Sequence, residues 1–331
     1  MYIGCDLFSS SIKFQRIENF VLKKLKKKFK NIKILEVISK KPQHKMLNKI
    51  EIYWGNRISP RLIQCMPNLK WIHYASTGFS KEIYNQVSKK NIKVTNTQNM
   101  FSNAVASTVF SYIFSLARGV HHCQSLKVEK KLNRKNFDKI SENIQDVFNQ
   151  KILIVGLGGI GKKIAKICKA MEMEISVIKK NANTVPSFIK KVLKLSDLKE
   201  AVKDVDYVVN ILPLTEKTNN IFNKKIFKSM KKTSFFINVG RGGTVNEQDL
   251  LSAIKAKKIL GAALDVMKEE PVKIKSPFLK KKNVILTPHI AGVTNNYWHD
   301  QYLLFSENLI RYKKGLKLIN LKKLNNLKEG Y

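Results

Sequence analysis

Short hydrophobic runs alternate with polar, lysine-rich stretches along the first third of the chain. The runs are rich in Ile, Val, Trp and Tyr, which favour strands, and the stretches between them favour helices. This alternation predicts a small parallel α/β unit over residues 1–98. Its strands are expected within residues 32–38, 49–55, 69–76 and 92–97.

A second series of hydrophobic runs begins at KILIV, residues 151–155, directly after a polar segment rich in Lys and Asn. One helix of this series is expected around residues 198–203, with Ser196 as its N-cap. Strand and helix alternate repeatedly, which predicts a doubly wound parallel sheet. The further strands are expected within residues 174–178, 206–214, 234–240, 260–266 and 283–289.

Two longer helices are predicted outside these two series. Residues 104–116 are apolar around most of the helix, which is typical of a helix buried between domains or subunits. Residues 295–313 form an amphipathic pattern that ends at Gly315, a residue suited to a helix C-terminus. A chain of 331 residues exceeds what one core usually serves, so we expect two domains.

The net charge of +38 raises nucleic acid or an anionic membrane as partners, because clustered cations bind phosphate. The 55 Lys and 7 Arg are spread along the chain, beside many Asn and Ile residues whose codons, like those of Lys, are rich in A and T. Even the densest run, Lys23 to Lys30, is more typical of a solvated helix face than of a basic membrane or RNA helix. We therefore expect neither partner.

The four cysteines, Cys5, Cys65, Cys123 and Cys168, stand far apart, without a CxxC pair or a His-Cys cluster at metal-ligand spacing. This pattern predicts reduced thiols and no metal site. The first residues show no basic segment ahead of an apolar one, and no run of about 18 uncharged apolar residues occurs. We expect a cytoplasmic protein that is neither secreted nor membrane-spanning.

The segment GLGGIG follows KILIV and precedes a helical pattern, which is the setting that makes a dinucleotide-binding fingerprint specific. Gly156 would form the tight turn, Gly158 would let backbone N–H groups approach the pyrophosphate, and Gly161 would let the helix pack closely on the sheet. The helix N-terminus would favour the anion. A set of tight turns without a ligand is the less favoured interpretation.

The end of the strand at 174–178 bears on the choice of cofactor. NAD-specific folds usually place Asp or Glu there to bind the ribose hydroxyls, whereas this chain has Lys179 and Lys180. Two cations suit a 2′-phosphate, although a chain with 55 Lys can place a pair there through composition alone. NADP is therefore favoured over NAD, and both remain open.

Hydride transfer to a 2-oxo acid needs a cation for the carboxylate, a group that protonates the carbonyl oxygen, and a carboxylate that supports that group. Arg241 follows a predicted strand and precedes two glycines, where it suits bidentate carboxylate capture. His289 follows another predicted strand and can exchange a proton near neutral pH. Glu270 could hydrogen-bond that imidazole and favour its protonated form, with Glu269 as a neighbouring rival.

Five segments together resemble signatures of the D-isomer-specific 2-hydroxyacid dehydrogenase family, and the resemblance runs through nearly the whole chain. They are GLGGIG (156–161), NILPLTEKT (210–218), INVGRGGTVNEQDL (237–250), GAALDVMKEEPV (261–272) and VILTPHIAG (284–292).

This family resemblance implies two Rossmann-like domains of α/β class. Residues 99–293 would form the dinucleotide-binding domain with its doubly wound parallel sheet. Residues 1–98 and 294–331 would form a flavodoxin-like, discontinuous substrate domain. The resemblance also implies a homodimer with the helix at 104–116 at its interface, where Ser107 stands in place of a usual Glu.

By the same resemblance, Arg241 would bind substrate, and Glu270 and His289 would form the acid/base pair. The segment WIHYASTGFS resembles, less specifically, the loop whose amides hold the substrate carboxylate, here at Ser76, Thr77 and Gly78. The nicotinamide end of the cofactor would contact Asp265. The expected cofactor-binding residues are Gly156, Gly158, Gly159, Ile160, Gly161, Lys179, Lys180, Pro213, Thr218, Val239, Gly240, Asp265 and Gly292.

The favoured function is reduction of a short 2-oxo acid, such as glyoxylate or hydroxypyruvate, with NADPH or NADH. Two alternatives stay open: 3-phosphoglycerate dehydrogenase, which uses the same three residues, and a cofactor-sensing binding protein similar to the corepressors of this fold. Nucleic-acid binding through the net charge is the least favoured. Trp54, Tyr74 and Trp298 either shape the pocket or belong to the core.

Overall fold

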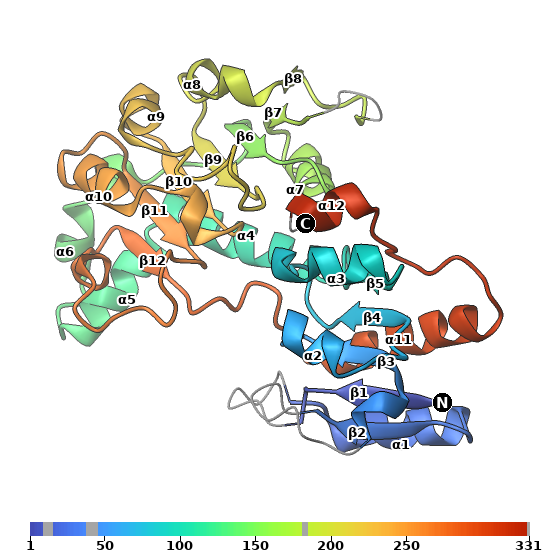
Figure 1. Ribbon diagram of the computed structural model, residues 1–331. Helices are drawn as coiled ribbons and strands as arrows, with labels where there is room; N and C mark the ends of the chain where they lie inside the picture. The colour runs from blue at the N-terminus through green and yellow to red at the C-terminus, as the bar shows by residue number, and fades with distance from the viewer. Residues whose placement is uncertain (9–15, 38–45, 181–184, 330–331) are drawn as a thin grey trace. The chain divides into compact units, whose positions relative to one another are not determined.

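The computed structural model describes residues 1–8, 16–37, 46–180 and 185–329. The chain forms two compact units, one of residues 1–100 with 293–331 and one of residues 101–292. We call them the terminal unit and the central unit. Each is built on a parallel β-sheet with helices packed on it (Figure 1), so the mixed α/β class expected from the sequence is confirmed.

The terminal unit has a 5-stranded sheet in the order β2-β1-β3-β4-β5, which is the flavodoxin-like order. The hydrophobic pattern predicted four of these strands and missed β1, and Ile38 of the first predicted run lies outside the described residues. The strands are β1 (Tyr2–Cys5), β2 (Lys33–Glu36), β3 (Ile50–Gly55), β4 (Trp71–Tyr74) and β5 (Lys93–Thr95). The helices are α1 (Asn19–Lys28), α2 (Pro60–Gln64), α3 (Tyr84–Lys89), α11 (Tyr297–Lys313) and α12 (Leu324–Glu329).

Trp54, Tyr74 and Trp298 belong to the core of the terminal unit. Trp54 is fully buried and stacks on Phe305 of α11, with ring centroids 4.1 Å apart. Trp298, also on α11, meets Trp54 edge to face at 6.4 Å. Tyr74 is buried in the separate apolar cluster on the other side of the sheet. The core interpretation therefore holds for all three aromatic residues.

The central unit has a 7-stranded sheet in the order β12-β11-β10-β9-β6-β7-β8. Strands are added outward in both directions from β6, so the order reverses between β6 and β9. Ligands of such sheets bind at this switch point, outside the carboxyl ends of the strands. The strands are β6 (Lys151–Val155), β7 (Glu174–Ile178), β8 (Lys191–Leu193), β9 (Tyr207–Asn210), β10 (Phe235–Asn238), β11 (Gly261–Leu264) and β12 (Val284–Leu286).

Helices cover both faces of the central sheet because side chains along each strand alternate between two apolar clusters. On β6, Ile152 and Ile154 join the cluster that includes α4 and α7, while Leu153 and Val155 join the cluster that includes α8, α9 and α10. The helices of this unit are α4 (Ser102–Ala117), α5 (Val120–Val128), α6 (Arg134–Asp138), α7 (Gly159–Ala170), α8 (Leu198–Ala201), α9 (Lys224–Ser229) and α10 (Glu247–Lys255).

The predicted N-cap at Ser196 is wrong. Helix α8 begins at Leu198 after Asp197, and no side chain caps its first turn. The Ser196 hydroxyl contacts the Asp197 carboxylate at 3.1 Å, and that carboxylate accepts the Lys194 amide at 2.9 Å. The polar residues before α8 therefore stabilise a short turn of their own and leave the helix uncapped.

Two other helix predictions are confirmed. Helix α1 exposes its lysines and buries Val21 and Leu25, as expected of a solvated face. Helix α11 ends ahead of Gly315, which has a φ of 67°, and the next amide, Leu316 N–H, donates to the Arg311 carbonyl at 2.8 Å.

Within the described residues, no helix combines the length and apolar character needed to cross a membrane.

Candidate active site

The loop after β6 lies at the switch point of the central sheet. Gly156 has a φ of 112°, a conformation that glycine adopts readily and other residues rarely do. A Cβ on Gly161 would lie 2.3 Å from the Gly156 carbonyl oxygen, so the first turn of α7 packs directly on this loop. The backbone alone therefore requires glycine at both positions.

Gly158 has a different environment. It is exposed, and a Cβ built on it would meet no atom within 4 Å. Helix α7 starts immediately after it, without a side-chain cap and without an acidic residue in the first turn. The uncapped N–H groups at a helix start favour an anion, and the space beside Gly158 is open. A dinucleotide pyrophosphate fits this cradle.

Further expected cofactor residues support the loops beside this cradle. Thr218 is 6% exposed and donates its hydroxyl to the Pro213 carbonyl at 2.6 Å. A Cβ on Gly240 would lie 2.7 Å from the Leu212 carbonyl oxygen, so the loops after β9 and β10 touch there. Of the remaining expected residues, Val239 is buried, and Gly159, Ile160 and Gly292 are half-buried.

Lys179 and Lys180 follow β7 directly, at the same edge of the sheet as the glycine loop. The backbone N–H of Lys179 donates to Leu193 on the neighbouring strand β8 at 3.0 Å. Lys179 is half-buried and Lys180 is exposed. Residues 181–184, which complete this loop, lie outside the described residues.

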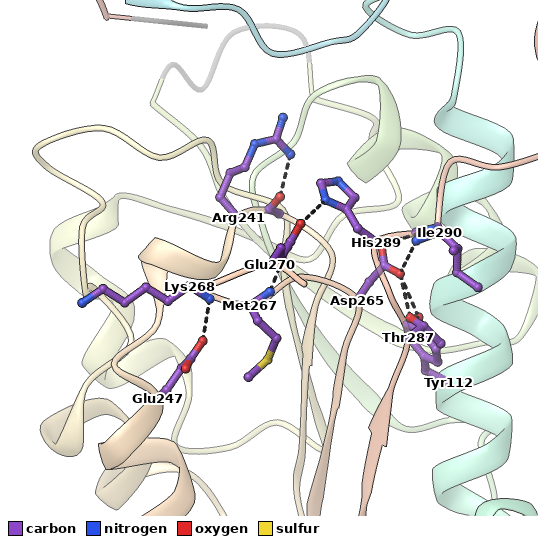
Figure 2. A network of polar contacts seen from close by, with 12 residues as sticks. Tyr112, Arg241, Glu247, Asp265, Met267, Lys268, Glu270, Thr287, His289 and Ile290 are labelled. Atoms are coloured by element: carbon purple, nitrogen blue, oxygen red, sulfur yellow. Dashed lines mark hydrogen bonds and ion pairs between the residues drawn. The ribbon is translucent and has the colours of Figure 1, made fainter. Parts of the chain in front are cut away.

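Arg241, Glu270 and His289 lie at the carboxyl ends of β10, β11 and β12 in the central unit (Figure 2). The Arg241 guanidinium donates to the Gly240 carbonyl at 2.8 Å. Burial lowers the pKa of Arg241, and the neighbouring Glu270 charge raises it. A guanidinium keeps its charge at neutral pH under such shifts, so a fixed cation stands beside the acidic side chain.

The His289 and Glu270 side chains form a direct pair. Nδ1 of His289 lies 2.8 Å from Oε2 of Glu270, and the two side chains are 50% and 36% exposed. The other oxygen of Glu270 accepts the Met267 amide at 3.1 Å, which fixes the carboxylate. Glu269 is turned to solvent and pairs with Lys273 at 2.5 Å. The geometry therefore selects Glu270 over Glu269 as the partner of His289.

His289 has a φ of 56°, a left-handed conformation that costs a residue other than glycine about 1–2 kcal/mol. Its amide donates to the Asp265 carbonyl at 2.8 Å. The Asp265 carboxylate, 2% exposed, accepts the amides of Ile290 at 2.8 Å and Ala291 at 3.0 Å. Asp265, the residue expected to contact the nicotinamide, thus binds the His289 loop through both of its carboxylate oxygens.

The loop of Ser76, Thr77 and Gly78 belongs to the terminal unit and follows β4. It is closed by a bond from the Ser76 hydroxyl to the Gly78 carbonyl at 2.8 Å, and Asn96 donates to the Thr77 carbonyl at 2.5 Å. Among the described residues, none accepts a hydrogen bond from the three amides of this loop. The loop therefore presents donors that suit a carboxylate.

Comparisons with known proteins match this architecture. The sequence model described as "D-isomer specific 2-hydroxyacid dehydrogenase, NAD binding domain" matches residues 110–291, more than half of the chain. A glyoxylate reductase from Pyrococcus horikoshii is 30% identical over 270 residues, which are 79% of this chain and 78% of that protein. The chain belongs to the D-isomer specific 2-hydroxyacid dehydrogenase family.

Two further proteins are similar to this chain. D-3-Phosphoglycerate dehydrogenase from Archaeoglobus fulgidus is 30% identical over 80% of this chain, which spans about half (49%) of that protein's length. An NADPH-dependent glyoxylate/hydroxypyruvate reductase from Sinorhizobium meliloti, solved with NADP and sulfate, has the same fold with a TM-score of 0.80, 20% identity and coverage of 100% of this chain and 99% of that one.

Family membership makes this dehydrogenase an enzyme that uses a nicotinamide cofactor and transfers hydride between that cofactor and a 2-hydroxy or 2-oxo acid. The family, the fold class and the enzyme class expected from the sequence are thereby confirmed. In the described part of the chain, no group of three or more His, Cys, Asp or Glu side chains could hold a metal ion.

Buried polar residues behind the dehydrogenase site were missed by the sequence interpretation. Asn210 donates to Asn238 at 2.9 Å and to the Thr244 hydroxyl at 2.7 Å, and Asn238 accepts the Gly240 amide at 3.1 Å. These bonds tie the carboxyl end of β9 to the loop that carries Arg241. The sequence contained a sign of these bonds, because the apolar runs of β9 and β10 both end in Asn.

Proposed function

We propose that this dehydrogenase reduces short 2-oxo acids such as glyoxylate or hydroxypyruvate with NADPH. The main support is the His289–Glu270 pair, whose Nδ1 and Oε2 atoms lie 2.8 Å apart, with Arg241 beside it. All three residues lie at the carboxyl ends of strands in the central sheet. Named relatives support the substrate class, since several that match most of this chain are glyoxylate reductases.

In this proposal the bound nicotinamide supplies the hydride, and the residues of the chain hold and protonate the substrate. Arg241 binds the substrate carboxylate and polarises the carbonyl oxygen. The His289 imidazolium donates a proton to that oxygen as it becomes a hydroxyl. Glu270 holds the imidazole by Nδ1 and stabilises its charged form, which leaves Nε2 for the substrate.

We also propose that the terminal unit is the substrate domain and that the central unit binds the cofactor. The open amides of Ser76, Thr77 and Gly78 support this assignment, because backbone donors in a turn suit an anion. The central unit in turn has the glycine loop, the open space at Gly158 and the uncapped start of α7.

The cofactor is proposed to be NADP, with Lys179 and Lys180 at the 2′-phosphate. Both lysines follow β7, where a carboxylate for ribose hydroxyls would otherwise stand. Structural relatives in this family were solved with NADPH or NADP bound.

Lys179→Asp should shift the ratio of kcat/KM values for NADPH and NADH toward NADH, because it replaces a cation with an acceptor for ribose hydroxyls. A matched control is Lys228→Asp, on the exposed side of α9, which makes the same change in charge away from the site. If both variants keep the wild-type ratio, the 2′-phosphate assignment is wrong.

The test of the function is loss of NADPH or NADH absorbance with glyoxylate, hydroxypyruvate, pyruvate, 2-oxoglutarate and phosphohydroxypyruvate. We expect rapid turnover of glyoxylate or hydroxypyruvate with NADPH. Preference for phosphohydroxypyruvate would favour 3-phosphoglycerate dehydrogenase, a second candidate supported by the Archaeoglobus fulgidus relative. Cofactor binding without turnover of any acid would instead indicate a sensing protein.

A homodimer that uses the surface around α4 is also proposed. Large apolar side chains are exposed on α4, on α5 and in the segments that follow: Phe114 is 42%, Val128 is 84% and Leu132 is 57% exposed. Exposed apolar residues that gather on neighbouring elements are typical of association surfaces. Light scattering coupled to size exclusion should give twice the 38.0 kDa mass of the chain.

We propose a cytoplasmic location as well. All four cysteines are unpaired, and Cys5 and Cys168 are fully buried as thiols. Thiols that remain reduced are typical of a reducing compartment.

A further inference from the structure

The side chain of Tyr112, on helix α4, joins the network behind His289. Tyr112 is 4% exposed, and its hydroxyl is hydrogen-bonded to the Thr287 hydroxyl and lies 3.5 Å from Oδ1 of Asp265 (Figure 2). The Thr287 hydroxyl lies 2.6 Å from the same Asp265 oxygen. Residues separated by more than 150 positions in the sequence thus meet at one buried carboxylate.

The directions of these hydrogen bonds follow from the chemistry of the groups. An ionised carboxylate only accepts, so Thr287 donates its proton to Asp265. The Thr287 oxygen then accepts from Tyr112, which leaves Tyr112 as the outermost donor of the series. Burial raises the pKa of Tyr112, so the phenol keeps its proton throughout the working range of the enzyme.

The network acts on the backbone that carries His289. Asp265 accepts the amides of Ile290 and Ala291 through its carboxylate and that of His289 through its carbonyl. These bonds hold the left-handed turn at His289, and that turn sets where the imidazole meets Glu270. Tyr112 fixes the orientation of the Thr287 hydroxyl, and Thr287 adds a donor to a carboxylate that two backbone amides otherwise hold alone. Loss of either side chain would therefore loosen the orientation of the Asp265 carboxylate.

We propose that Tyr112 is a positioning residue for His289, acting through Thr287 and Asp265. The inference rests on the proposed acid/base role of His289 and adds a residue that touches neither substrate nor cofactor. If the hydroxyl serves only packing, its removal should alter stability alone; if it positions the loop, its removal should alter proton transfer.

Tyr112→Phe removes the hydroxyl and keeps the ring. The matched control is Tyr207→Phe on β9, whose hydroxyl is buried in the same unit without a hydrogen-bond partner among the described residues. Tyr112→Phe should lower kcat by about 10- to 100-fold, as small misplacements of reacting groups do, with the NADPH Kd unchanged and the pH profile of kcat displaced. Tyr207→Phe should have the wild-type kcat, NADPH Kd and pH profile.

Thr287 supplies the second half of this test. Thr287→Val should lower kcat as Tyr112→Phe does, whereas Thr287→Ser, which keeps the hydroxyl, should keep most of the wild-type kcat. The kcat of the Tyr112→Phe/Thr287→Val double variant should be no lower than that of the slower single variant. Wild-type kcat and pH profile in Tyr112→Phe, or additive losses in the double variant, would overturn the proposal.

Imidazole NMR of the full chain separates this inference from the proposed function. The His289 resonances are identified by their loss in His289→Asn, and their pH titration is followed in wild type, Tyr112→Phe and Tyr207→Phe. A changed titration in Tyr112→Phe alone supports positioning even if no oxo acid is turned over, in which case only the proposed function fails. Identical titrations in all three proteins overturn the positioning role.

Discussion

Glu269 and Glu270 are adjacent residues of one type with different surroundings, and this difference yields a paired prediction. Glu270→Gln keeps the shape of the side chain but removes the charge that stabilises the His289 imidazolium, so kcat should fall by about 100-fold. Glu269 has only a solvent-exposed ion pair with Lys273, and such pairs contribute little. Glu269→Gln should therefore leave kcat unchanged.

Steady-state kinetics with saturating NADPH and the preferred oxo acid measures both variants, and fluorescence titration of NADPH confirms that each still binds cofactor. If kcat falls equally in the two variants, the loss of any acidic charge near the site is enough to explain the effect. If both variants keep the wild-type kcat, Glu270 has no role in the mechanism.

The glycine loop and α7 act together as one element, and two of its glycines serve separable purposes. At Gly161 an added Cβ would lie 2.3 Å from the Gly156 carbonyl oxygen, so Gly161→Ala should lower the free energy of unfolding by about 1–3 kcal/mol. At Gly158 the added methyl would meet no atom within 4 Å apart from its chain neighbours, and the φ of −85° and ψ of −158° of Gly158 suit alanine.

Gly158→Ala should therefore keep the wild-type Tm of the cofactor-free enzyme and weaken NADPH binding by about 10-fold or more, equivalent to roughly 1.4 kcal/mol. Thermal melts without cofactor and fluorescence titration with NADPH provide the two readouts. Full NADPH affinity in Gly158→Ala would show that the pyrophosphate binds elsewhere.

The elements of this dehydrogenase were more predictable than their contacts. Strands β9, β10 and β11 follow from apolar runs, and the acid/base candidates follow from residues placed just beyond such runs. The left-handed turn at His289 could not be foreseen, because it depends on bonds to Asp265, which lies 24 positions earlier in the chain. Tyr112 could not be recognised either, since a tyrosine in an apolar helix is indistinguishable from a packing residue until its hydroxyl finds a partner.

At the scale of the whole molecule, we expect a buried histidine of the terminal unit to make the stability depend on pH. His73 on β4 is fully buried, and its Nδ1 lies 2.7 Å from the Thr95 hydroxyl, which also accepts the Trp71 indole N–H at 2.8 Å. The Thr95 proton is therefore available to Nδ1 of a neutral imidazole. Burial lowers the pKa of His73 from its ordinary value of 6.5 to about 3.

This shift has a definite sign. Between pH 6.5 and about 3 the unfolded chain binds a proton at His73 and the folded chain does not, so protons favour unfolding in this window. The free energy of unfolding should thus fall as the pH is lowered, by up to about 1.4 kcal/mol for each pH unit from this group. Above pH 6.5 the contribution is constant, because His73 is neutral in both states.

The terminal unit offers its own probe, because all three tryptophans, Trp54, Trp71 and Trp298, belong to it. Urea unfolding followed by tryptophan fluorescence from pH 8 to pH 4 should give a shallower pH dependence in His73→Asn than in wild type, even though the smaller side chain lowers stability at pH 8. The exposed His299 of the same unit is the control, and His299→Asn should follow the wild-type slope. Parallel slopes in wild type and His73→Asn would mean that the loss of stability in acid comes from other groups, such as carboxylates whose protonation adds to the existing net charge of +38.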